Sequence, residues 1–135
     1  MQITKQADYA LRAIIYLSQL EEGGKASTSK IAEAQEIPAS FLAKIISQLS
    51  IAGLIHTSRG ARGGVSLAKE PQEITVLDVI QAIDGPVVLN ECTENPGACP
   101  FHDSCPLYNL WEETREMLVK KLSGANFAGI KTTAA

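Results

Sequence analysis

Hydrophobic residues recur every three or four positions through the first part of the chain, and this period predicts three amphipathic helices. The first is expected over residues 4–20, with Thr4 as its N-cap. A short second helix is expected to begin at the potential capping residues 27–29. The third, over residues 38–52, has the clearest pattern, and its apolar stripe consists of Leu42, Ile45, Ile46 and Leu49.

Two short strands are expected after the third helix, over residues 54–57 and 65–68. The segment between them, 58–64, contains three glycines. Glycines at this density are typical of a hairpin loop, because glycine readily adopts left-handed backbone conformations. A helix–turn–helix followed by a hairpin is the winged-helix arrangement. We therefore predict a mainly α fold with a small β-hairpin wing.

The second half of the chain contains two further helical patterns separated by an irregular segment. One helix is expected over residues 76–84. Residues 85–106, here termed the cysteine loop, contain four of the six prolines and all three cysteines. A last helix over residues 107–122 has one apolar side formed by Leu107, Leu110, Trp111, Leu118 and Leu122. A small domain has too little core to cover that side, so we expect pairing with a second copy and a flexible tail after Ser123.

The composition is that of an ordinary folded domain and not of a basic protein that coats nucleic acid. The chain has 135 residues, 45% of them hydrophobic, and a formal net charge of −3. Residues 1–70 carry eight basic and six acidic side chains, whereas residues 71–135 carry four basic and nine acidic ones. Only the first half has a positive balance that suits a polyanion. The sequence lacks an apolar stretch long enough to cross a bilayer and an N-terminal signal pattern, so we expect a cytoplasmic protein.

The surface that the helix–turn–helix and the wing would present is polar and locally basic. The second helix of such a unit usually enters the major groove of DNA, and an arginine among glycines can enter a narrow minor groove. The candidate DNA-binding residues are Thr28, Ser29, Ser40, Lys44, Ser47, Gln48, Ser58, Arg59 and Arg62. A solvated turn, or a winged helix that docks proteins, is the alternative interpretation of this pattern.

Cys92, Cys99 and Cys105 have the spacing C-x6-C-x5-C. Zinc sites usually use closer pairs, whereas wider spacing leaves room for a larger inorganic core, and thiolates are the usual ligands of iron–sulfur clusters. The fourth ligand is then His102, a carboxylate from elsewhere or an exchangeable small molecule. A disulfide switch with one spare thiol, a zinc site completed by His102 and unliganded cysteines stay open. A cysteine-dependent enzyme is not expected, because neither histidine lies in an evident base and orienter arrangement.

Four segments together resemble one known family of regulators. They are residues 3–12 (ITKQADYALR), 41–46 (FLAKII), 59–65 (RGARGGV) and the three-cysteine segment. On these motifs the chain resembles the Rrf-two family over about residues 1–122. The resemblance implies a homodimeric winged-helix transcription factor that binds a near-palindromic DNA operator, with an iron–sulfur cluster that controls its affinity.

The same resemblance implies a ligand set. IscR-like members carry a His three residues after the last cysteine, and this chain has Tyr108 there. NsrR-like members use an Asp on the first helix, and Asp8 matches that position. The resemblance therefore favours Cys92, Cys99 and Cys105 together with Asp8 of the partner subunit, and a 4Fe–4S over a 2Fe–2S cluster. A family member without a cluster, acting through thiol oxidation or a protein partner, is the alternative.

These expectations divide the chain into three regions. Residues 1–70 are expected to form a winged helix–turn–helix DNA-binding domain. Residues 71–106 supply a linker helix and the loop that binds the cluster, and residues 107–135 a dimerisation helix with a flexible tail. The predicted function is a DNA-binding transcriptional regulator, not an enzyme, whose cluster senses iron, redox state or nitric oxide.

Overall fold

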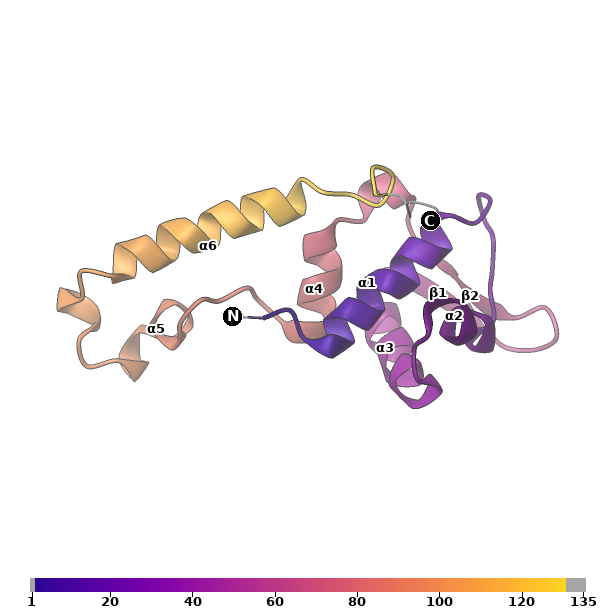
Figure 1. The fold of residues 1–135 in the computed structure, drawn as a ribbon, viewed down its shortest axis with the longest axis horizontal. Helices are drawn as coiled ribbons and strands as arrows, with labels where there is room; N and C mark the ends of the chain where they lie inside the picture. The colour runs from indigo at the N-terminus through magenta and orange to yellow at the C-terminus, as the bar shows by residue number, and fades with distance from the viewer. Residues whose placement is uncertain (1, 131–135) are drawn as a thin grey trace.

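The computed structural model describes residues 2–130 and confirms a mainly helical winged-helix fold. Figure 1 shows a body formed by the N-terminal helices and the hairpin, from which α6 and the cysteine loop extend as an arm. The elements, in chain order, are α1 (Lys5–Ser18), α2 (Thr28–Gln35), α3 (Ala39–Ile51), β1 (Ile55–Ser58), β2 (Gly64–Leu67), η1 (Pro71–Glu73), α4 (Val76–Asp84), α5 (Glu91–Glu94), η2 (Pro96–Ala98), η3 (His102–Ser104) and α6 (Tyr108–Ser123). None of the helices within residues 2–130 is long and apolar enough to span a membrane.

The predicted helices begin and end at residues that can cap them. The Thr4 side chain accepts a hydrogen bond from the Ala7 amide at 3.1 Å, and the Ser27 side chain accepts one from the Lys30 amide at 3.1 Å. Gly53 follows α3 with a φ of 78°, a left-handed conformation that suits glycine after a helix. The local signals in the sequence were therefore sufficient to place the helix–turn–helix.

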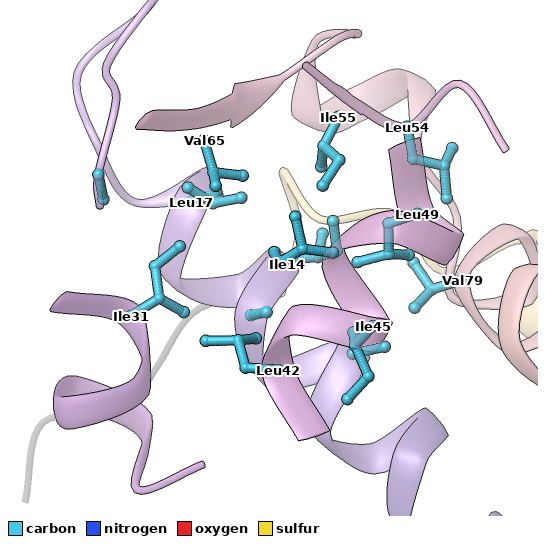
Figure 2. Packing of buried hydrophobic residues seen from close by; sticks show 14 of the residues in the cluster. Ile14, Leu17, Ile31, Leu42, Ile45, Leu49, Leu54, Ile55, Val65 and Val79 are labelled. Carbon is cyan, nitrogen blue, oxygen red and sulfur yellow. The ribbon is translucent and has the colours of Figure 1, made fainter. Parts of the chain in front are cut away.

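The core forms where α1, α3 and α4 pack against one another, with the hairpin along one side. Figure 2 shows Ile14 of α1 close to Leu49 of α3, with Ile55 of β1 packed over them. The whole apolar stripe predicted for α3 is buried. Each large aliphatic side chain buried in this way stabilises the fold by about 1.5–3 kcal/mol.

Helix α4 is part of this core, although the sequence places it in a linker region. Val79 is fully buried in the same cluster as Ile14. Thr75 and Asp78 form a capping box at the start of the helix, so the backbone amides of both residues are hydrogen-bonded. The hydrophobic core thus extends past residue 70 and holds the start of the segment that leads to the cysteine loop.

The wing is an antiparallel hairpin in which Ile55 of β1 pairs with Leu67 of β2. The Val65 amide also donates to the Ala26 carbonyl oxygen at 2.7 Å, and the Ala26 amide donates to the Val65 carbonyl oxygen at 3.0 Å. A Cβ atom on Gly64 would lie 2.9 Å from the Ala26 carbonyl oxygen. Glycine at this position therefore allows the hairpin to lie directly against the segment before α2.

The segment after α6 is bound to the body, contrary to the sequence prediction. The Phe127 amide donates to the Ile74 carbonyl oxygen at 3.2 Å, and the Phe127 side chain is 3% exposed within the main core cluster. The prediction of a flexible tail is therefore wrong for residues 124–130, because the burial of one aromatic ring outweighs the entropy lost by its small neighbours. Residues 131–135, the rest of that predicted tail, lie outside the described range.

Removing the Phe127 ring tests whether the C-terminal segment stabilises the body. Phe127→Ala is expected to lower the free energy of unfolding by about 3–5 kcal/mol, because it leaves a cavity in the core. Urea unfolding followed by circular dichroism measures this change. Ile51→Ala is the matched control, since the Ile51 side chain is 85% exposed and its loss should change stability by less than about 0.5 kcal/mol. Unchanged stability of Phe127→Ala would contradict the packing of this segment.

Candidate functional site

The outer face of α3 carries short polar side chains and one cation. Ser40, Lys44 and Ser47 are exposed, on the side opposite the buried stripe. Gln48 is half-buried at the edge of this face, and its Oε1 is enclosed with no hydrogen-bond partner among the described residues. The face therefore offers two hydroxyl groups and an ammonium group that can bond to base edges and phosphates.

The first turn of α2 holds two more of the predicted hydroxyl groups. Ser27 caps the helix, and Thr28 and Ser29 occupy its first two positions. Thr28 is half-buried and Ser29 is exposed. The first backbone amides of a helix have no acceptor within the helix, so this turn presents amide donors beside two hydroxyls, a combination that suits a phosphate.

The wing loop places two arginines on an exposed turn. Arg59, which directly follows the last residue of β1, and Arg62, three residues further on, are both exposed. The Gly63 amide donates to the Gly60 carbonyl oxygen at 2.9 Å, which closes a turn that contains Arg62 and directly follows Arg59. In Figure 1 this loop lies at the end of the molecule opposite the cysteine loop. A narrow basic turn of this kind is suited to a DNA groove.

Asp8, the predicted oxygen ligand, is paired with Arg12 within the chain. Arg12 Nη2 lies 3.4 Å from Asp8 Oδ2, and the Asp8 side chain is 50% exposed. Arg12 Nη1 also donates to the Gln35 carbonyl oxygen at 3.0 Å, at the end of α2. The next residue, Glu36, has a left-handed φ of 51° and turns the chain toward α3. Arg12 therefore joins the Asp8 carboxylate to the turn of the helix–turn–helix.

Aromatic and cationic side chains surround this ion pair, and the sequence analysis did not single them out. Lys5 Nζ and Arg12 Cζ lie 5.1 and 5.0 Å from the centroid of the Tyr9 ring, and the Phe41 ring centroid lies 6.1 Å from it. We call these four residues the aromatic patch. Helical spacing on α1 could have indicated the contacts of Tyr9 with Lys5 and Arg12. Phe41 comes from α3 and is placed only by the fold.

The cysteine loop is less irregular than predicted, because it forms three single helical turns, α5, η2 and η3. Cys92 lies in α5 and is buried, whereas Cys99 and Cys105 follow η2 and η3 and are partly exposed. All three are free thiols. The short turns therefore leave three potential thiolate ligands in one segment.

His102 lies between the second and third cysteines. Its ring packs edge-on against Tyr108, with 4.5 Å between the ring centroids. His102 Nδ1 is enclosed and has no hydrogen-bond partner among residues 2–130. Tyr108, at the position where IscR-like members carry a His, thus packs here against the His102 imidazole, which lies between two of the cysteines in sequence.

One chain does not bring the four favoured ligands together. Within the described residues, no three His, Cys, Asp or Glu side chains are grouped so that they could hold a metal ion. In Figure 1 the cysteine loop starts at the end of α4 and runs through α5 to the far end of the arm, whereas Asp8 is on α1 in the body. The types of donor do fit an iron–sulfur cluster, because three free thiols lie in one loop. Bringing the four favoured ligands together would require the three thiols to approach one another and Asp8 to come from a second chain.

Comparisons with known proteins identify the family. The family model Rrf2, described as an iron-dependent transcriptional regulator, matches residues 3–132. A protein of Aquifex aeolicus (strain VF5) that is named as an HTH-type transcriptional regulator is 37% identical over 112 residues. The match spans 82% of this chain and 77% of the Aquifex protein.

Two solved structures share the fold over nearly the whole chain. CymR (YrzC) of B. subtilis, described as the global cysteine regulator, matches with a TM-score of 0.77 at 28% identity, over 95% of this chain and 94% of that one. IscR of T. potens matches with a TM-score of 0.72 at 26% identity, over 95% of this chain and 84% of that one. The chain therefore belongs to the Rrf2 family, whose members are DNA-binding transcriptional regulators and not enzymes.

Proposed function

We propose that the protein is a homodimeric regulator that binds a DNA operator and whose operator affinity is controlled by an iron–sulfur cluster. The observation that carries this proposal is the presence of three free thiols in one loop, at the end of the arm that also contains α6. A sensor loop in this position can change how two subunits are held without unfolding the body that contacts DNA.

In this proposal α3 lies in the major groove. Lys44 and the two serines of α3 contact base edges or phosphates, with Gln48 at the rim, and the hydroxyls at the start of α2 bind a phosphate. Arg59 and Arg62 of the wing, with Ser58, contact the adjacent backbone and minor groove. Because the net charge of the chain is −3, these few contacts and not bulk attraction set the affinity.

Helix α6 supplies the dimer surface. None of its residues is buried, and the large side chains of Leu110 and Met117 are exposed. An open groove of about 780 Å³ runs beside Met117 and Leu118. A second copy of α6 covers this apolar side, which the core of one chain cannot do. Two-fold pairing then presents two α3 helices to half-sites about one turn of DNA apart.

The proposed cluster ligands are Cys92, Cys99 and Cys105 of one subunit and Asp8 of the partner subunit. The Asp8 carboxylate is half-exposed, so a second chain can reach it, whereas the cysteines of its own chain are at the end of the arm. We propose the 4Fe–4S type, with 2Fe–2S as the other type that this ligand set allows. When bound, the cluster supplies a centre that is sensitive to redox state, nitric oxide and iron supply.

Arg12 connects the proposed ligand to the DNA-reading helix. When the Asp8 carboxylate binds the loop of the partner subunit, it neutralises the charge of Arg12 less than it does in the ion pair. The Arg12 guanidinium group is then attracted more strongly to the Gln35 carbonyl oxygen, which it already contacts. That carbonyl group lies at the turn that positions α3. Binding of Asp8 to the cluster therefore changes the orientation of α3. Even a small change in the separation of the two α3 helices of a dimer then removes contacts with DNA at both half-sites.

A second candidate function is regulation without a cluster, through oxidation of thiols or a protein partner. It is favoured by the three free cysteines and by the lack, within residues 2–130, of a ready-made group of three metal ligands. The similarity to a global cysteine regulator agrees with this alternative. Disulfide formation between two of the three cysteines would restrain the same loop, so the two candidates share a mechanism and differ in the signal.

Iron and sulfide content distinguishes the two candidates. Anaerobically isolated protein is expected to contain about four iron and four acid-labile sulfide ions per subunit, with sulfur-to-iron charge-transfer absorbance. Cys99→Ser should abolish the iron and sulfide content together with the absorbance, and Asp8→Ala should speed the loss of iron. Glu33→Ala, which removes an exposed carboxylate on α2, is the control and should retain iron. Colourless protein without iron or sulfide would contradict the proposed cluster and favour regulation through thiol oxidation.

Substitutions in α3 and the wing test the DNA interface. Lys44→Ala and Arg59→Ala are each expected to weaken binding about tenfold, because each removes one charged contact. Binding is measured by fluorescence anisotropy at physiological salt, with a duplex that the unchanged protein selects from a random pool. Lys69→Ala removes an exposed cation outside α3, the wing loop and α6 and should leave the affinity unchanged. Full affinity of Arg59→Ala would exclude the wing contact.

A further inference from the structure

The junction segment, which we define as residues 25–30, lies against the wing at one end and begins α2 at the other. It carries two exposed lysines, Lys25 and Lys30. The Ala26 amide donates to the Val65 carbonyl oxygen of β2 at 3.0 Å, and the Val65 amide donates to the Ala26 carbonyl oxygen at 2.7 Å. The rest of the segment forms the first turn of α2. The junction segment therefore links the wing to the helix–turn–helix.

Both lysines of the junction segment point away from the core. The Ala26 side chain is buried, and successive side chains of an extended backbone alternate between two faces, so Lys25 is on the outer face. Lys30 is the third residue of α2, and helical side chains tilt toward the N-terminus of their helix. The two ammonium groups can therefore meet a ligand in front of the first turn of α2.

The surroundings of the two lysines are positive, although carboxylates lie on both sides along the chain. The junction segment and the wing together carry two lysines, two arginines and no acidic side chain. Glu33 follows Lys30 by three positions on α2. Glu21 and Glu22, which precede Lys25, line a separate cavity of about 400 Å³ beside the end of β2. Within residues 2–130 neither lysine forms an ion pair, so both charges are available to an anion.

One strand of the DNA backbone lies opposite the junction segment if α3 and the wing bind DNA as proposed. A sugar–phosphate strand separates the major groove from the adjacent minor groove, so a body with α3 in one groove and the wing in the other spans that strand. The junction segment is bonded to the wing, and α2 packs on α3. Figure 1 shows α2 between α3 and the wing loop. The segment therefore faces the strand that separates the two grooves.

We propose that Lys25 and Lys30 bind neighbouring phosphates of this strand and so join the DNA contacts of α3 to those of the wing. The proposal rests on the placement of α3 and the wing in the proposed function, and it requires no cluster. Contacts with phosphates fix the position of a protein on DNA but carry no information on base sequence. The two lysines therefore raise the affinity for every duplex, whereas α3 and the wing arginines select the operator.

A phosphate bound to Lys25 also restrains the wing. The next residue, Ala26, is joined to Val65 by two hydrogen bonds, and a Cβ atom on Gly64 would lie 2.9 Å from the Ala26 carbonyl oxygen. Because the two backbones are in such close contact, the hairpin and the junction segment move together. The contact between Lys25 and a phosphate therefore helps to hold the wing loop at the minor groove.

The salt dependence of binding tests the two contacts in the full-length protein. Lys25→Gln and Lys30→Gln are each expected to weaken binding about five- to tenfold at physiological salt, and to lower the slope of log Kd against log salt by about 0.9 per bound subunit. The loss should be the same for the selected duplex and for a random one, because phosphates are common to both. Lys69→Gln removes an exposed cation two residues after β2 and should leave affinity and slope unchanged.

Neutral phosphates locate the contacts. A methylphosphonate replaces one phosphate of the selected duplex at a time, and binding of the unchanged protein should weaken about five- to tenfold at each contacted position. At one of these positions Lys25→Gln should show no further loss, and at a neighbouring one Lys30→Gln should show none, since the contact is already absent. Both positions should lie on one strand, between the bases that Lys44 contacts and the minor groove that Arg59 enters.

The outcomes separate this inference from the proposed function. If Lys44→Ala and Arg59→Ala weaken binding and the two glutamine variants do not, the junction contact is wrong and the placement of α3 and the wing stands. If none of the four variants weakens binding, both are wrong. A loss confined to the selected duplex, or methylphosphonate effects that persist in both glutamine variants, would also contradict the phosphate contacts. All variants are compared at the same iron and sulfide content, so that the state of the proposed cluster does not affect the result.

Discussion

The packing of α1 against both α3 and α4 is the contact on which every functional surface of this protein depends. Ile14 on the inner side of α1 is fully buried with Leu49 of α3 and Val79 of α4. Asp8 and Arg12 lie on the same helix, closer to solvent. The burial that stabilises the fold therefore also fixes the distance between the proposed sensing residue and the helix proposed to read DNA.

The body and the arm are held together by different kinds of interaction. The body has a continuous hydrophobic core, whereas α6 has no buried residue and is tied to the rest by a few specific contacts. Arg115 Nε donates to the Val87 carbonyl oxygen at 2.8 Å, and the Phe127 ring enters the core beyond the end of α6. An arm that packs on α4 and α5 and still has no buried residue in α6 leaves an apolar side that is suited to receive a second subunit.

The proposed regulation uses this difference. A rigid body keeps the contacts with DNA in a defined arrangement, and a loop on the arm can respond to iron, redox state or nitric oxide. Arg12 contacts Asp8 and the end of α2, and Tyr9 of the aromatic patch contacts Phe41 at the start of α3. A change at the loop would then alter the separation of the two α3 helices. Because the half-sites have a fixed spacing on DNA, they tolerate little change in this separation.

The sequence by itself determined the winged-helix body, since Thr4, Ser27 and Gly53 act through hydrogen bonds and backbone preferences within a few residues. It also identified the three cysteines and the cationic wing. Only the tertiary structure placed Phe127 in the core, paired Asp8 with Arg12 and brought Phe41 to Tyr9. These contacts join segments distant in the chain or select one partner among several. Local periodicity carries no information on such choices, because the close packing of the whole core decides them.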